Sequence, residues 1–163
     1  MKHIKRVTLV LFCTWLTACA TPPFELGERE VAPYTPVQAL HQAEAQNALV
    51  MWGGQIVATQ NFADYSRIEV VSTPLDSAGR PQLDDELGIR FVVEVEGFLE
   101  PVLYASGRYL TALGHVQGDT EVISGEALLK APLLDAESLH LWPKDQGRWR
   151  PDVNFGVGVG IRL

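Results

Sequence analysis

Two cysteines, at positions 13 and 19, are the first candidates for chemistry in this 163-residue sequence. Cys19 ends the segment Leu16-Thr17-Ala18-Cys19, in which small residues stand directly before the thiol. A signal peptidase has a narrow pocket that accepts such small residues. A lipoprotein signal peptidase also needs a cysteine that already carries diacylglycerol. The chemistry indicated for Cys19 is therefore lipidation, with a diacylglyceryl group on its thiol, and not catalysis or metal binding.

The residues before Cys19 have the pattern of a secretory signal. Lys2, Lys5 and Arg6 form a basic start, and a mostly apolar stretch of 12 residues follows at 7–18. This stretch has the length of a signal-peptide core and is shorter than the roughly 20 residues that span a membrane. The pattern resembles a bacterial lipobox and predicts a lipoprotein signal peptide at residues 1–18 and lipidation at Cys19. The alternatives are an ordinary signal peptide, or a buried strand in which the cysteine is incidental.

Cleavage after residue 18 changes what the rest of the chain can do. It would leave 145 residues with a net charge of −10, because all 20 acidic residues and only 10 of the 13 basic ones follow. Cys13 would be lost, so the mature domain would have no disulfide and no Cys-ligated metal. Acyl chains such as palmitate on Cys19 would anchor the chain to a membrane. By resemblance to enterobacterial lipoproteins, in which Asp after the cysteine favours inner-membrane retention, Ala20 predicts the outer membrane.

Metal-ligating and catalytic patterns are weak in the mature region. His41, His115 and His140 have no ligand spacing and are interpreted as structural. The acidic run at 84–86 lacks the spacing of a calcium loop and is interpreted as a solvated turn. No G-x-S-x-G elbow or phosphate-binding loop is present, and no carboxylate pair stands out for glycoside hydrolysis. The sequence therefore predicts no enzyme, no catalytic residue, no metal and no cofactor.

Two further features concern binding partners. Lys144, Arg148, Trp149 and Arg150 form a basic-aromatic patch that could touch anionic lipid headgroups or a sugar. The alternative is a linker surface without a partner. The negative charge of the mature chain would repel phosphates, so nucleic-acid binding is not expected.

The elements that position these residues are a tether, one short helix and several strands. The Pro-rich stretch 19–34 predicts a flexible lipidated tether. Thr35-Pro36-Val37-Gln38 resembles a capping box that starts a helix in a run of helix formers extending to Asn47. From residue 48 the apolar period is two, with strands expected at 48–58, 67–72, 91–96, 108–116, 121–130 and 138–142.

Glycines and tryptophans refine this strand pattern. Gly53-Gly54 predicts a bulge, a tight bend or a close backbone approach in the first strand. Gly118-Asp119 is expected to be a turn, and Trp52 and Trp142 are expected in the core. In the tail at 144–163, apolar residues alternate with glycine from Phe155 onwards. This segment is either the last strand of the domain or a strand that adds to a sheet edge.

A series of short motifs carries a resemblance to a known family. They run in this order: Val50-Met51-Trp52-Gly53-Gly54-Gln55-Ile56, Thr59-Gln60-Asn61, Arg67-Ile68-Glu69-Val70, Pro74-Leu75-Asp76, Gly79-Arg80-Pro81, Gly97-Phe98-Leu99-Glu100-Pro101, Tyr104, Gly107-Arg108, Thr111, Gly114, Val116 and Leu141-Trp142-Pro143. This series resembles the Slp family of outer-membrane lipoproteins, from the lipobox to about residue 143. One departure is Leu128-Leu129-Lys130-Ala131-Pro132, where family members tend to have Tyr-x-Tyr-Pro.

The resemblance implies a cellular location and a fold, and it implies no active-site residues for this chain. It agrees with the strand pattern on a mainly β fold: a small, mostly antiparallel, OB-like β-barrel at residues 35–143. The leading hypothesis is an outer-membrane-anchored structural or interaction protein of the cell envelope, related to stress or starvation, with an envelope protein partner. The alternatives are a lipoprotein that binds a lipid, sugar or peptidoglycan fragment, and an envelope hydrolase.

Overall fold

Five strands make up half of the described chain, which comprises residues 23–82 and 87–144 of this computed structural model. They are β1 (Leu49–Asn61), β2 (Tyr65–Ser72), β3 (Arg90–Glu96), β4 (Tyr109–Ser124) and β5 (Ala127–Leu141). The prediction of a mainly β fold is confirmed. The signal peptide, Cys19, the acidic run at 84–86 and the glycine-alternating tail lie outside the described residues.

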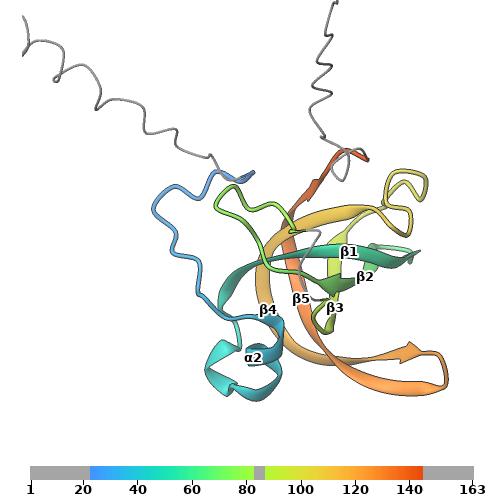
Figure 1. Cartoon of the computed structure of the whole chain (residues 1–163), viewed down its shortest axis with the longest axis horizontal. Coiled ribbons are helices and arrows are strands. Elements are labelled where there is room, and N and C mark those ends of the chain that lie inside the picture. Colours follow the sequence, from blue (N-terminus) through green and yellow to red (C-terminus); the bar gives the residue numbers. More distant parts are fainter. Residues whose placement is uncertain (1–22, 83–86, 145–163) are drawn as a thin grey trace, which may run out of the picture.

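The strands close on themselves in the order β1-β2-β3-β5-β4, so that β4 returns to β1 and forms a closed barrel (Figure 1). Neighbouring strands are antiparallel except β3 and β5, which run parallel through Val92–Leu133, Val93–Leu134 and Glu94–Asp135. The parallel pair arises because β4 pairs with β1 across the barrel, and β5 then returns beside β3 in the same direction. Among the described residues no helix is both long and apolar enough to cross a bilayer.

The barrel interior is filled by the inward side of each alternating strand. In β2 every second residue from Ser66 to Ser72 is buried, while Arg67 and Glu69 on the other face pair with Glu94 and Arg90 across β2–β3. Twelve buried residues form the core: Val50, Trp52, Ile56, Ile68, Val70, Phe91, Val93, Leu110, Ala112, Val116, Leu134 and Ala136. Trp52 and Trp142 are both buried, as predicted.

Glycines allow the first strand to lie close to both of its neighbours. A Cβ on Gly54 would overlap the carbonyl oxygen of Val71 on β2. A Cβ on Gly53 would lie 2.8 Å from the carbonyl oxygen of Leu110 on β4. The predicted close backbone approach at Gly53-Gly54 is therefore confirmed, and it lets β1 coil tightly enough for the barrel to close.

The prediction of a turn at Gly118-Asp119 is wrong. The β4–β5 register shifts between Val116 and Gly118, where Gly118 has a φ of 110°, and the strand continues to Ser124. A bulge absorbs the glycine here because the ladder resumes on both sides of it. The true turn is Gly125-Glu126, with Gly125 at a φ of 63°, so three expected strands are in fact the two long strands of one hairpin.

A short helix and a packed N-terminal segment complete the described fold. Helix α2 (Pro36–His41) begins at a capping box, in which Thr35 accepts from the backbone N–H of Gln38 and Gln38 accepts from that of Thr35. It ends at His41 rather than near Asn47, because Gln42 is extended and a 3₁₀ turn, η1 (Ala43–Ala45), buries Ala45.

The segment before the helix contacts the barrel. The backbone N–H of Ala32 donates to the carbonyl of Leu49 at 2.8 Å, and Arg29 pairs with Glu137 on β5. Pro23 lies against Gly79. The described part of the predicted tether thus runs along the barrel wall.

Candidate functional site

The outer end of the β4–β5 hairpin exposes apolar side chains on both of its faces. Ile123, Leu128 and Leu129 are 70, 61 and 43% exposed. Ile123 pairs with Leu128 across the ladder on one face, and Leu129 pairs with the buried Val122 on the other. We call these three residues the hairpin tip. The hairpin projects from the lower right of the barrel (Figure 1).

The base of the hairpin is packed, although its tip is not. Val92 points out of the barrel but is buried, because Val122 and Ala131 of the hairpin cover it, with Leu133 beside them. The side chain of Arg90 also reaches the carbonyl of Ile123 at 3.3 Å. The hairpin tip is therefore held in place by a second, small core outside the barrel.

A second exposed apolar surface lies on the connection between β3 and β4. Phe98, Val102 and Leu103 are 68, 71 and 52% exposed. We call these three residues the loop patch. The connection is fixed beneath them, because Asn61 and Ser66 hold the backbone of Leu99 and Gly97 through side-chain hydrogen bonds.

A positively charged depression of about 310 Å³ lies beside the loop patch. It is lined by Ser106, Gly107, Arg108, Tyr109, Pro143 and Lys144. The Arg108 guanidinium donates to the carbonyls of Leu103 at 3.1 Å and Trp142 at 2.8 Å, while its Nε is buried with no hydrogen-bond partner among the described residues. All of its partners are neutral, so the cation has no described carboxylate to balance it.

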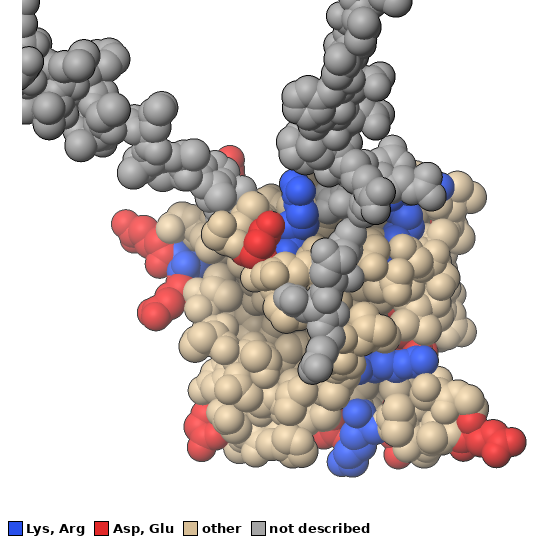
Figure 2. Space-filling view, viewed as in Figure 1, with Lys and Arg blue, Asp and Glu red and all other residues tan. Residues whose placement is uncertain are grey.

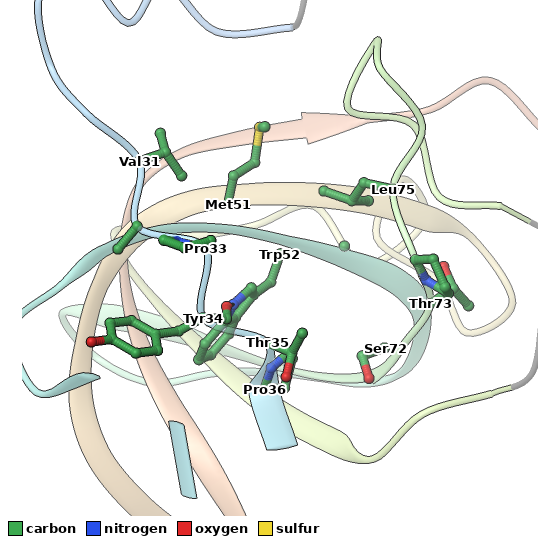
Figure 3. A pocket seen from close by; sticks show the side chains of 13 residues that line it. Val31, Pro33, Tyr34, Thr35, Pro36, Met51, Trp52, Ser72, Thr73 and Leu75 are labelled. Atoms are coloured by element: carbon green, nitrogen blue, oxygen red, sulfur yellow. Dashed lines mark hydrogen bonds between the residues drawn. The ribbon is translucent and has the colours of Figure 1, made fainter. Parts of the chain in front are cut away.

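A shallow groove of about 420 Å³ separates the N-terminal segment from the β1–β2 wall (Figure 3). Its apolar lining includes Val31, Pro33, Tyr34, Met51, Trp52 and Leu75, and its polar lining includes Ser72 and Thr73. Trp52 Nε1 donates to the carbonyl of Tyr34 at 2.7 Å and fixes one wall. The Thr73 hydroxyl is buried without a hydrogen-bond partner in the described chain. Because the barrel interior is packed, this external groove is the better place for a small ligand.

The three predicted structural histidines lie apart from one another. His115 Nδ1 is 2.9 Å from the carbonyl of Asn47, and its Nε2 is 3.2 Å from Glu137. His140 packs edge-on against Trp142 at 4.2 Å between ring centroids, and His41 is exposed at the end of α2. No group of three or more metal-ligating side chains occurs among residues 23–82 and 87–144.

Glu137 is the carboxyl whose pKa the surroundings lower. The hydrogen bond from Arg29 is the main cause, and the charges of Arg29 and His115 add to it, while burial acts in the opposite direction. These partners form a small surface network between the N-terminal segment, β4 and β5. The network ties these segments together.

Of the predicted basic-aromatic patch, Lys144 lies beside Arg108, whereas Arg148, Trp149 and Arg150 lie outside the described residues. The sequence analysis did not predict the loop patch, and it did not predict that the residues of the hairpin tip are exposed. Phe98 stood in a recognised motif, but a motif does not reveal whether its aromatic side chain is buried or exposed.

Comparison with known proteins adds the family. The profile of the outer membrane lipoprotein Slp family matches residues 16–156. The chain belongs to this family. The predicted location, a lipid-anchored position at the outer membrane, is thereby confirmed. Which residue carries the lipid is not decided by the match, so Cys19 stays a prediction.

Three proteins from two bacteria are similar to this chain in sequence. The uncharacterized lipoprotein YeaY of Escherichia coli is 29% identical over 144 residues, which cover 85% of this chain and 72% of that protein. An uncharacterized protein of Haemophilus influenzae is 29% identical over 161 residues, covering 88% of this chain and 82% of its own length. The outer membrane protein Slp of E. coli is 31% identical over 68 residues, or 42% of this chain and 36% of that protein.

Solved structures resemble the Slp-family chain only weakly. The small single-stranded DNA-binding protein of Streptomyces coelicolor aligns with a TM-score of 0.39 and 13% identity, over 59% of this chain and 94% of that chain. A putative aspartyl-tRNA synthetase of Leishmania major aligns with a TM-score of 0.42 and 10% identity, over 85% and 26%. Scores this low support no assignment of fold or function.

Proposed function

We propose that this Slp-family lipoprotein is a non-catalytic interaction module of the bacterial envelope, held at the outer membrane by acyl chains on Cys19. Residues 1–18 are its signal peptide, 19–34 its lipidated segment, 35–143 its barrel domain and 144–163 its tail. Its role in stress or starvation is implied by the family resemblance alone. The observation that carries the proposal is the hairpin tip, which is the part of the domain suited to a protein partner.

The hairpin tip has the make-up of a small contact surface. Monomeric proteins seldom leave neighbouring large apolar side chains exposed without a partner. Ile123 and Leu128 are exposed side by side on one face of the hairpin, and Leu129 is exposed on the other face. Asp119, Glu121, Glu126 and Lys130 are exposed in the same hairpin. An apolar centre with a charged rim is the usual anatomy of a protein interface. Leu128 and Leu129 also lie in the segment where the family resemblance implies Tyr-x-Tyr-Pro in other members, which suits a partner specific to this chain.

Site-specific photo-crosslinking in intact cells tests this function. A photoreactive residue at Leu128 should capture one reproducible envelope protein. The same residue at Gln60, which is exposed on β1, should not capture that protein. Ile123→Ser should abolish capture from position 128 while leaving the fold intact. Equal capture from both positions, or only abundant neighbours from position 128, would contradict an interface at the tip.

The anchor itself is tested with Cys19→Ser. The variant should leave the outer-membrane fraction, and acyl chains detected by mass spectrometry on the N-terminal peptide of the native chain should disappear. A variant that stays membrane-bound through hydrophobic contacts alone would contradict the anchor.

A second candidate function is ligand binding in the groove of Figure 3. Its volume of about 420 Å³ lies in the range of small-molecule sites, and Thr73 offers, beside an apolar wall, a hydroxyl that has no hydrogen-bond partner among the described residues. A lipid, a sugar or a peptidoglycan fragment remains the candidate ligand class. Native mass spectrometry of the protein released gently from envelopes tests it, because a bound molecule would add a defined mass that Met51→Arg should remove.

The closed strand order supports the finer description of the domain as OB-like, a five-stranded Greek-key barrel. The envelope-hydrolase alternative has less support, because Glu94, Glu69 and Asp119 each pair with a cation on a neighbouring strand.

A further inference from the structure

The loop patch and the charged depression beside it form one continuous surface. Arg108 links them directly, since it lines the depression and donates to the carbonyl of Leu103 in the patch. Lys144 is exposed at the other side of the depression. We propose that this surface docks onto an anionic phospholipid bilayer. Phe98, Val102 and Leu103 enter the interfacial region, and Arg108 and Lys144 meet lipid phosphates.

The chemistry of the surface favours a lipid headgroup layer. Exposed Phe, Leu and Val side chains gain free energy in the interfacial region, and nearby cations are attracted to anionic headgroups. The guanidinium of Arg108 is held by neutral carbonyls, and no acidic side chain is among the described residues that line the depression. Glu100, exposed within the same loop, and Glu96, exposed at the end of β3, oppose the attraction. Even so, the region from 97 to 109 together with Lys144 contains two basic residues and one acidic residue.

The position of the surface brings it near the membrane. A chain of contacts joins Pro23 to the loop patch: Pro23 lies against Gly79, the Gly79 carbonyl accepts from the Thr111 hydroxyl, and Trp142 Nε1 donates to that hydroxyl. The carbonyl of Trp142 then accepts from Arg108. In Figure 1 both described chain ends and the β3–β4 connection lie on the upper side, and the hairpin lies on the lower side.

The length of chain before Pro23 completes the argument. Three residues separate Pro23 from Cys19. Four residue steps span at most about 14 Å. A bilayer that holds the acyl chains of Cys19 would therefore lie close to this side of the barrel. The proposal rests on the anchor at Cys19 for this step only.

A fluorescent probe at two matched positions tests the docking. Val102 and Ile123 are 71 and 70% exposed, so they start from equal contact with water. Val102→Cys and Ile123→Cys, each labelled with NBD in the full processed chain, are added to vesicles containing phosphatidylcholine and phosphatidylglycerol. At position 102 the emission should shift to the blue, and lipid-borne doxyl groups should quench it. At position 123 the probe should stay accessible to aqueous iodide.

Variants separate the contributions to docking. With the probe at 102, Phe98→Ser combined with Leu103→Ser should abolish the blue shift. Lys144→Gln should raise the vesicle concentration for half-maximal shift about fivefold, the equivalent of about 1 kcal/mol per cation near an anionic surface. Lys130→Gln, a matched change on the hairpin, should leave it unchanged. An excess of inorganic phosphate that did not weaken the shift would support a headgroup layer rather than a site for free phosphate.

Several outcomes would overturn the proposal. One is equal accessibility of both probes to iodide in the presence of vesicles. Another is a blue shift at 102 that appears without vesicles and grows with protein concentration, which would indicate self-association. Flotation of the same samples reports the anchor independently. Protein that floats while position 102 stays in water would contradict the docking and retain the anchor. Protein that does not float would contradict the anchor, and the probe would still decide the docking.

Discussion

The hairpin tip and the loop patch each expose three large apolar side chains to a similar degree, but their surroundings differ in charge and in place. The hairpin from 117 to 131 holds three acidic residues and one basic residue, whereas the loop-patch region holds one acidic and two basic residues. Acidic side chains stand at the outer end of the hairpin in Figure 2. The β3–β4 connection, which carries the loop patch, lies on the side of the described chain ends, and the β4–β5 hairpin lies on the opposite side (Figure 1).

Because its two exposed surfaces differ in charge, one small barrel can face two kinds of partner. Exposed apolar side chains indicate only that a surface binds a partner, and not which class of partner. The local charge then selects the class of partner, since anionic lipids repel the hairpin and attract the loop region. The barrel matters because it is rigid: a closed ring of strands keeps two surfaces of different character at opposite ends of the molecule.

The substitution with the largest expected effect is one that prevents the barrel from closing, because both exposed surfaces depend on the closed barrel. Gly54→Val places side-chain atoms where the carbonyl oxygen of Val71 lies, and β1 could then no longer pair closely with β2. We expect the free energy of unfolding to fall by about 3 kcal/mol or more, as measured by urea denaturation. Ala58→Val, at an exposed position of the same strand, should change it by less than about 0.5 kcal/mol. Equal stability of the two variants would show that barrel closure does not depend on this approach.

A substitution at Thr111 should destabilise the protein less, and only near the β3–β4 connection. Thr111 donates to the Gly79 carbonyl at 2.7 Å and accepts from Trp142 Nε1 at 2.9 Å, and both bonds are buried. Thr111→Val would leave these two groups unpaired, at a cost of about 2 kcal/mol. Hydrogen exchange should speed up around Arg108 and Trp142 but not at the hairpin tip. Thr120→Val, further along β4, is the control, and faster exchange across both regions would contradict a local role.

Features that depend on residues close together in the sequence could be predicted, whereas features that depend on contacts between distant segments could not. The alternation of Phe91, Val93 and Val95 identified β3, and Thr35 with Gln38 identified the helix start, because both signals are local. The turn predicted at Gly118 was wrong, because a glycine at positive φ is suited to a bulge as well as to a turn. Only the pairing of β4 with β5 shows that Gly118 belongs to a bulge.

The candidate surfaces were harder to predict. The groove joins residues 31–36 to 72–75, and the charged depression joins Arg108 to Lys144, so both depend on contacts between distant segments. Phe98 and Phe91 are the same residue type seven positions apart, yet one is 68% exposed and the other is in the core. The strand alternation predicts that Phe91 is buried, whereas the place of Phe98 in the connection after β3 does not report how far its side chain is exposed.

Removing the negative charge of the loop should strengthen vesicle binding. Glu100→Gln removes the acidic residue of the loop-patch region, so vesicle binding measured by the probe at 102 should strengthen about fivefold, or about 1 kcal/mol. Glu126→Gln makes the same chemical change at the hairpin turn, where no membrane contact is expected, and should have no effect. If Glu126→Gln strengthened vesicle binding equally, net charge rather than the position of the surface would control docking.

The smallest effect concerns the salt bridge that holds the N-terminal segment to β5. The Arg29 guanidinium lowers the pKa of Glu137, so folding is favoured when Glu137 is ionised. This contribution is present at pH values above the unfolded pKa and is lost as the pH falls through the lower, folded pKa. Both side chains are largely exposed, so Arg29→Gln should cost less than about 1 kcal/mol at pH 7. Urea denaturation at pH 7 and pH 3 should show the difference between wild type and variant shrinking in acid. A difference that persisted at pH 3 would mean that Arg29 stabilises the segment through its alkyl chain and not through its charge.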